Sequence, residues 1–188
     1  MANEILLKEG TQLLFADHAT DFGAAPDTAN NSLILGTPTD VQIDLTGVAA
    51  TGGARASTKS GDLGATRATA YDVKACLEFE SAPADGGFVY FYWAPSPSAT
   101  ATVGNPGGVS GTDAAYTDTT GNLGQLQFIG AMSVVNNVIS IGHVGTFQPK
   151  HRYGSLVIVN QASTAFRSTA TAMDETHITM TPLITEVQ

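Results

Sequence analysis

The most constraining feature of this sequence is a regular alternation of apolar and polar residues from Tyr71 to Glu80. A period of two places alternate side chains on opposite faces of an extended strand, so residues 71–80 predict a strand with one buried face. After the turn residues 81–87, residues 88–93 are apolar at every position, which is typical of a strand buried on both faces. We expect these two strands to pair as a hairpin at the centre of the fold.

Further short segments bounded by Gly, Asn, Asp or Pro also predict strands, at residues 11–16, 39–45, 125–132, 138–143, 153–160, 164–168 and 177–183. About eight to ten strands without a convincing helical segment predict an all-β fold, a single β-sandwich of jelly-roll type. The chain has 188 residues, of which 43% are hydrophobic, so one sizeable core is available. We expect this core to include Tyr71, Val73, Leu77, Phe79, Val89, Phe91, Trp93, Leu126, Phe128, Leu156 and Ile158.

Two segments interrupt the succession of predicted strands. Residues 47–65 are rich in Gly and Ser and hold little that could fill a core, so we expect a flexible loop or an arm laid on a neighbour. Residues 94–124 are rich in Gly, Pro and Ser and form a connection far longer than the usual loop of about 4–6 residues. Val103, Val109 and Tyr116 could pack, so we expect this long loop to be partly ordered.

Charge and hydropathy exclude two classes of partner. The 17 acidic residues outnumber the 8 Lys and Arg residues, giving a net charge of −9 that disfavours binding to nucleic-acid phosphates. No stretch approaches the roughly 20 apolar residues that span a bilayer, so no membrane partner is expected. Cys76 is the single cysteine, so no internal disulfide can form. Lys8 and Glu9 interrupt the first apolar run, so we expect no signal peptide, and the single cysteine favours synthesis in a reducing cytoplasm.

No motif indicates an enzyme, a metal or a cofactor. The four histidines, His18, His143, His151 and His177, lack the short spacing of zinc ligands, and His18 between Asp17 and Asp21 is weak evidence for a general base. The glycine-rich residues 104–111 lack the lysine of a phosphate loop, and Ser110 lacks the spacing of a nucleophile elbow. Asp113, Asp118 and Asn122 could offer oxygens to Ca²⁺, but the dense ligand pattern of an EF-hand is missing.

Two clusters have both a binding and a structural interpretation. Lys150, His151 and Arg152 form the only compact basic cluster, which could contact an acidic partner or be a solvated turn. Tyr90, Tyr92 and Trp93 could form a platform for stacking sugars. They lie within the most apolar predicted strand, so we expect them to pack in the core instead.

Several motifs carry a family resemblance. Residues 91–98 (FYWAPSPS), 104–111 (GNPGGVSG), 123–130 (LGQLQFIG) and 149–157 (PKHRYGSLV) resemble a group of tailed-bacteriophage virion structural proteins, and residues 6–11 (LLKEGT) are in keeping with it. The resemblance covers roughly the C-terminal half of the chain. It implies a component of a phage particle and supplies no catalytic residue.

Within such a particle, a small, cysteine-poor, β-rich chain is expected to be a capsid decoration or cement protein. Its expected partners are the major capsid protein and further copies of itself, as a homotrimer on the capsid surface. The expected contact residues are Arg55 and Lys59 in the first irregular segment, Asn105 and Tyr116 in the second, and Lys150, His151 and Arg152. The alternative is a tail-fibre or receptor-binding adhesin whose long loop recognises carbohydrate.

Overall fold

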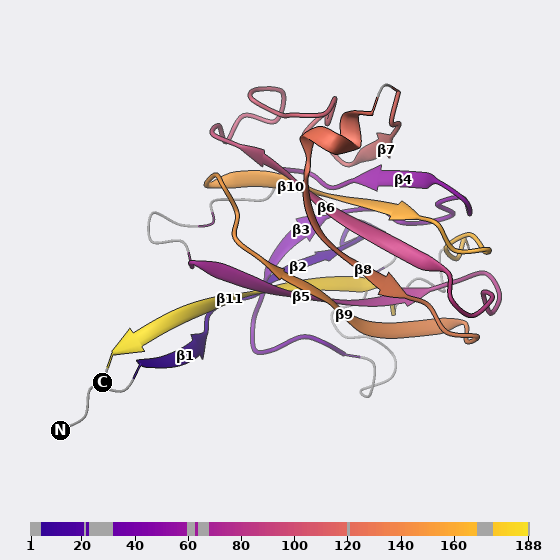
Figure 1. Cartoon of the computed structure of the whole chain (residues 1–188), viewed down its shortest axis with the longest axis horizontal. Coiled ribbons are helices and arrows are strands. Elements are labelled where there is room, and N and C mark those ends of the chain that lie inside the picture. Colours follow the sequence, from indigo (N-terminus) through magenta and orange to yellow (C-terminus); the bar gives the residue numbers. More distant parts are fainter. Residues whose placement is uncertain are drawn as a thin grey trace.

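The computed structural model describes residues 5–20, 22, 32–59, 63, 68–119, 121–168 and 175–187. Its strands form two sheets packed face to face, so the predicted all-β sandwich is confirmed (Figure 1). The first sheet contains β1 (Ile5–Glu9), β2 (Leu13–Ala16), β3 (Thr39–Gln42), β5 (Ala70–Glu78), β9 (Ile139–Phe147) and β11 (His177–Val187). The second contains β4 (Gly53–Ala56), β6 (Phe88–Ser96), β7 (Ala114–Tyr116), β8 (Gln127–Ser133) and β10 (Tyr153–Asn160).

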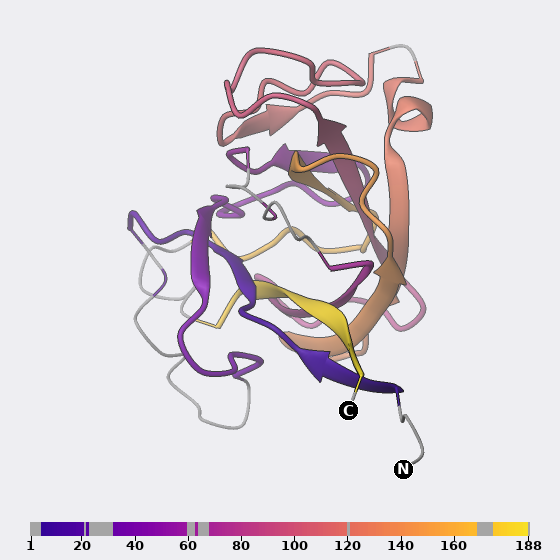
Figure 2. The same ribbon diagram turned by 90° about the vertical axis from the view of Figure 1, so that its left-hand side faces the viewer.

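The strand order is β3-β2-β11-β5-β9 in the first sheet, with β1 also paired to β11, and β7-β4-β10-β6-β8 in the second. All of these pairs are antiparallel except β2 with β3. The β1–β11 pair projects from one end of the sandwich as a ribbon (Figures 1 and 2). The jelly-roll connectivity stays a prediction.

The expected central hairpin is wrong. The strand predicted at residues 71–80 is β5, which pairs with β11 and β9, whereas the strand predicted at residues 88–93 is β6, which pairs with β10 and β8. The connection from β5 to β6 leads from the first sheet to the second. At its start, Phe79 forms an isolated bridge with Phe166, and the centroids of their rings lie 5.2 Å apart. Alternation shows which face of a strand is buried but does not show which strands pair with it. The pattern is the same for two strands that pair in one sheet and for two strands that face each other across the core.

Nine of the eleven predicted core residues lie in the core between the sheets; Leu126 is buried elsewhere, and Phe128 is exposed. Tyr71, Val73, Leu77, Phe79, Val89, Phe91, Trp93, Leu126, Leu156 and Ile158 are buried, whereas Phe128 is 53% exposed. Leu126 belongs to a second, smaller cluster on the outer face of the second sheet, together with Ala56, Ala94, Val109, Tyr116 and Val157. We call this second group the outer cluster.

Within residues 47–65, expected to form a flexible loop or an arm laid on a neighbour, residues 53–56 instead form β4, which pairs with both β10 and β7. Thr51 and Gly52 adopt positive φ angles of 56° and 118° and turn the chain into this strand. Just after it, buried Ser57 accepts a hydrogen bond from the N–H of Leu156 at 2.9 Å and donates its own N–H to Leu156 O at 2.8 Å. Residues 60–62 and 64–67 of this segment lie outside the described residues.

Residues 94–124 are partly regular, as expected. Their first residues continue β6 to Ser96, their middle forms β7, and their end forms a single-turn 3₁₀ helix, η1 (Asn122–Gln125). Val109 and Tyr116 are buried as predicted, but Val103 is 49% exposed. The segment lies against the outer face of the second sheet, where the outer cluster holds it (Figure 2).

The other predicted strands are confirmed with shifted ends, except residues 164–168, which form only the isolated bridge at Phe166. Along one side, the two sheets approach so closely that β8 and β9 need glycines. A Cβ on Gly130 would lie 2.0 Å from Val144 O, and one on Gly145 would lie 2.6 Å from Ile129 O. Within the described parts of the chain, no helix is long and apolar enough to cross a membrane.

Candidate functional site

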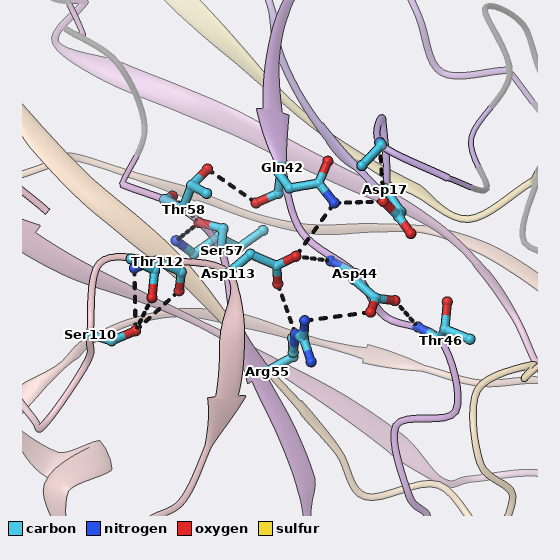
Figure 3. A network of polar contacts seen from close by, with 12 residues as sticks. Asp17, Gln42, Asp44, Thr46, Arg55, Ser57, Thr58, Ser110, Thr112 and Asp113 are labelled. Atoms are coloured by element: carbon cyan, nitrogen blue, oxygen red, sulfur yellow. Dashed lines mark hydrogen bonds and ion pairs between the residues drawn. The ribbon is translucent and has the colours of Figure 1, made fainter.

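A polar network closes the other side of the sandwich (Figure 3). Arg55 on β4 donates from Nε to Asp113 Oδ1 at 2.8 Å and from Nη2 to Asp44 Oδ2 at 3.4 Å. Gln42 on β3 donates from Nε2 to Asp17 Oδ1 at 2.6 Å and to Asp113 Oδ2 at 3.4 Å. Because β3 and β4 belong to different sheets, the network joins the two sheets at this edge.

The network contains one guanidinium and three carboxylates: Arg55 contacts Asp113 and Asp44, whereas Asp17 accepts hydrogen bonds from neutral groups. The hydrogen bond from Arg55 to Asp113 raises the pKa of the guanidinium, although burial acts in the opposite direction. Burial pushes the pKa of Asp17 upward, but hydrogen bonds from Thr20, Gln42 and nearby backbone N–H groups lower it overall. Arg55, expected to contact a partner, has a side chain only 24% exposed and engaged within the chain. The network therefore links the two sheets by hydrogen bonds and ion pairs, and we call it the Arg55 clamp.

Lys59 is also engaged within the chain. Its ammonium donates to Ser96 Oγ and to the carbonyl oxygens of Ser98, Thr100 and Val103, at 2.7–3.1 Å. The three N–H donors of the ammonium are shared among these four oxygen acceptors and thereby hold the start of the long loop in place. Burial lowers the pKa of this lysine.

Asn105 and Tyr116 stabilise the same loop. Asn105 Nδ2 donates to Ala101 O at 2.5 Å, and the buried hydroxyl of Tyr116 donates to Gly107 O at 2.9 Å. Partner contact by these residues, as by Arg55 and Lys59, stays a prediction. Their visible role is to hold the loop against the second sheet.

The basic cluster Lys150, His151 and Arg152 lies exposed in the connection between β9 and β10. The Arg152 guanidinium carbon sits 5.5 Å from the centroid of the Tyr153 ring, within the range of a cation–π contact. Gln148, at the start of this connection, accepts a hydrogen bond of 2.7 Å from Gln127 Nε2 on β8. The cluster is therefore displayed beside the first residues of β8.

The structure pairs Cys76 on β5 with His177 on β11, a neighbourhood that the sequence analysis missed. His177 Nδ1 donates to Glu175 O at 2.7 Å, and its Nε2 accepts from the N–H of Leu33 at 3.0 Å. Burial lowers the pKa of His177. Burial and the neighbouring carboxylates of Glu175 and Glu78 raise the pKa of the Cys76 thiol to about 12. The thiol of Cys76 is therefore protonated, and both ring nitrogens of His177 already have hydrogen-bond partners. Neither group is in a state to react, so we interpret the pair as part of the folded structure.

The remaining chemical candidates stay apart. His143 Nε2 lies 2.7 Å from Asp72 Oδ1 on the outer face of the first sheet, and His18 Nδ1 lies 3.8 Å from Asp40. Asp113 faces Arg55, whereas Asp118 accepts from the N–H of Leu123, so the structure does not assemble the proposed calcium ligands. Ser110 Oγ bonds only within its own turn, to Thr112. Among the described residues, no group of His, Cys, Asp or Glu is placed to hold a metal ion.

Aromatic residues gather instead on the outer face of the second sheet. Tyr90 and Tyr92 on β6 face outward, beside Phe88 and Phe128, which are 42% and 53% exposed. Tyr92 and Phe128 have ring centroids 5.3 Å apart, and Tyr90 and Phe128 have centroids 6.4 Å apart. Trp93 points to the opposite face and is fully buried, as expected, whereas the core packing expected of Tyr90 and Tyr92 is wrong.

A β-bulge explains the exposed Phe128. Along β6 and β8 the pairing runs in step from Phe88 with Ser133 to Phe91 with Gly130, and then shifts so that Tyr92 pairs with Phe128. Ile129 is the extra residue. A shift of one residue moves side chains to the other face of a sheet, so Phe128 and Leu126 turn outward.

An open groove of about 510 Å³ lies over these rings, lined by Tyr90, Tyr92, Leu123, Gly124, Leu126 and Phe128. We call it the aromatic groove. Comparison with models of known protein families and with curated proteins finds no match to this sequence. The site must therefore be interpreted from its own geometry.

Proposed function

We propose that this chain is a structural protein of a tailed-bacteriophage particle and acts as a decoration or cement protein on the capsid. It would associate as a homotrimer and bind the major capsid protein through protein–protein contacts. The proposal is supported by the sequence resemblance described above and by the place of its motifs in the fold.

The outer cluster is the observation that carries the proposal. It takes Ala94 from residues 91–98, Val109 from 104–111, Leu126 from 123–130 and Val157 from 149–157. Each of the four main motifs thus contributes a buried residue to one layer over the second sheet. This layer is separate from the core between the sheets, so the sandwich alone does not require it. A fixed outer layer is a feature that docking surfaces need, because preorganised loops lose less entropy on binding.

The electrostatics favour a polar rim contact through the basic cluster. The described surface carries few cations, and Lys150, His151 and Arg152 are exposed together. Such rim charges mainly steer association with an acidic patch on the partner.

The first experiment is reconstruction of intact particles, with quantitative mass spectrometry of their proteins. We expect many copies per genome-filled head, arranged in trimers on the outer capsid surface. Light scattering of the purified chain should give a trimer mass. A few copies at the tail tip would contradict the proposal and favour the adhesin.

The second experiment tests attachment with the double variant Lys150→Gln/Arg152→Gln. We expect several-fold weaker attachment to capsids at low salt, with the difference shrinking as salt rises. Lys74→Gln, which removes an exposed lysine from the outer face of the first sheet, is the matched control and should attach normally. Equal attachment of both variants and the unmodified chain would argue against docking through the basic cluster.

The adhesin is the second candidate function. It is favoured by one observation, the exposed aromatic groove on the second sheet. In that case the purified chain should bind host cells.

A further inference from the structure

The aromatic groove has the form of a binding site. Large apolar side chains exposed together on a folded protein usually mark a contact surface, whereas single exposed ones are ordinary. Here two rings, Tyr92 and Phe128, lie directly opposite each other on neighbouring strands, and Tyr90 leans on the same phenylalanine. The volume of about 510 Å³ lies within the range of small-molecule sites, about 300–1,000 Å³.

The rim of the groove is polar. The η1 turn contributes Leu123 and Gly124 to the groove lining, and Asn122 and Gln125 flank these two residues in the sequence. The exposed Gln125 accepts from the N–H of Gly107 and donates from Nε2 to Asn122 Oδ1 at 3.4 Å. A primary amide has two N–H donors, and one of those of Gln125 is used in the bond to Asn122. Burial raises the pKa of Tyr92, with further contributions from Tyr90 and from Asp118, so its phenol remains a neutral hydroxyl at neutral pH.

An aromatic floor with hydrogen-bonding groups at its edge matches the two-sided chemistry of a sugar. A pyranose ring presents C–H bonds on its face and hydroxyl groups around its edge, so the face can stack on rings while the hydroxyls meet amides. An apolar peptide side chain would use the rings of the groove but not the tyrosine hydroxyls, whereas a sugar can use both. The open groove therefore fits a glycan better than a protein anchor.

Charge narrows the class of glycan. Asp118 lies on the exposed segment beside Tyr92, and the whole chain carries a net charge of −9. Asp118 and the net charge disfavour an acidic sugar in the groove, although the exposed basic cluster near the first residues of β8 acts in the opposite direction. We propose that the aromatic groove, formed by Tyr90, Tyr92, Phe128 and the η1 turn, is a binding site for an uncharged pyranose residue of a glycan. This inference rests on the groove alone and holds wherever the chain sits in a particle.

Gly124 offers a sharp test. It lines the groove, and a Cβ added there would meet no atom within 4 Å. A larger side chain at this position should therefore fill the groove without displacing the protein. Gly124→Leu should block binding, and Phe128→Ala should remove a stacking ring. Ile141→Ala is the control, because Ile141 is 46% exposed on β9 in the other sheet.

The experiment titrates each protein with an array of neutral hexose and N-acetylhexosamine oligosaccharides, followed by tyrosine fluorescence and calorimetry. A sialylated oligosaccharide of equal length serves as the acidic probe. We expect saturable binding of at least one neutral oligosaccharide and an affinity loss of about tenfold or more in Gly124→Leu and Phe128→Ala, typical of a lost anchor. Ile141→Ala should bind normally, and the sialylated probe should bind at least about tenfold more weakly.

Three results would overturn the inference. Binding that survives both groove variants would place the glycan elsewhere. Failure of every neutral oligosaccharide in the array to bind the unmodified chain would also overturn the inference. The third is loss of particle attachment in both groove variants, with no glycan bound by the unmodified chain, which would make the groove a protein contact. Circular dichroism of each variant checks that it is folded.

Discussion

Truncation of Phe91 should test the core of the sandwich against its surface. Phe91 lies on β6 with no exposed surface, facing the first sheet, whereas Phe128 lies on the neighbouring strand and is half exposed. Burial of a phenylalanine removes about 150–200 Å² from water, which at about 25 cal/mol per Å² gives an upper value of about 4–5 kcal/mol. Measured Phe→Ala changes in cores cost about 3–5 kcal/mol. We expect Phe91→Ala to lower the free energy of unfolding by about 4 kcal/mol.

The assay is equilibrium unfolding in urea, followed by the fluorescence of the single tryptophan, Trp93, which is itself buried. The slope of the free energy against urea should stay unchanged, and the midpoint should fall. Phe128→Ala is the matched control and should cost less than about 1 kcal/mol, as expected for a partly exposed site. Equal losses in both variants would refute the assignment of Phe128 to the outer face.

Three further perturbations test separate parts of the fold. Gly130→Ala should lower the melting temperature in calorimetry by several degrees, since its Cβ would overlap Val144 O, while Gly124→Ala should leave it nearly unchanged. Burial lowers the pKa of His177, so the native state favours the neutral ring; stability should be full above about pH 6.5 and fall as the pH drops below it, and His177→Gln should remove this part of the pH dependence of the urea midpoint. Arg55→Met should cost about 1–3 kcal/mol in urea unfolding, because Asp113 loses its charged partner, and adding Asp113→Leu should restore part of the loss.

The sequence predicts the strands better than their neighbours. Alternation and turn residues identify most strands and nearly the whole core, because both depend on local periodicity. They did not identify β5 and β6 as members of opposite sheets. Each strand buries alternate residues, such as Val73 on β5 and Phe91 on β6. This pattern is the same whether the two strands pair in one sheet or face each other across the core. The short β4 was also missed, since Gly53, Ala54 and Ala56 give it little hydrophobic signal.

The candidate site was half visible in the sequence. Tyr90 and Tyr92 were recognised as possible sugar contacts, and strict alternation would have separated them from Trp93. The sequence could not assign Phe128 to the outer face, because no residue pattern within 125–132 indicates the bulge at Ile129. The contact of Cys76 with His177 depends on pairing between β5 and β11, which local patterns do not encode.

The two sides of the sandwich are joined by different means. Gly130 and Gly145 allow backbone contact between β8 and β9, and the Arg55 clamp joins β3 to β4. The outer cluster lies on the outer face of the second sheet and shares Leu126 with the aromatic groove. Phe128 of the groove follows Gln127, which donates a hydrogen bond to the connection that carries Lys150 to Arg152. The residues that line the groove include none of this basic turn, so glycan binding and attachment through the basic cluster can be tested separately. Loss of capsid attachment in the Lys150→Gln/Arg152→Gln variant, with glycan binding retained, would therefore show that the two neighbouring surfaces serve separate partners.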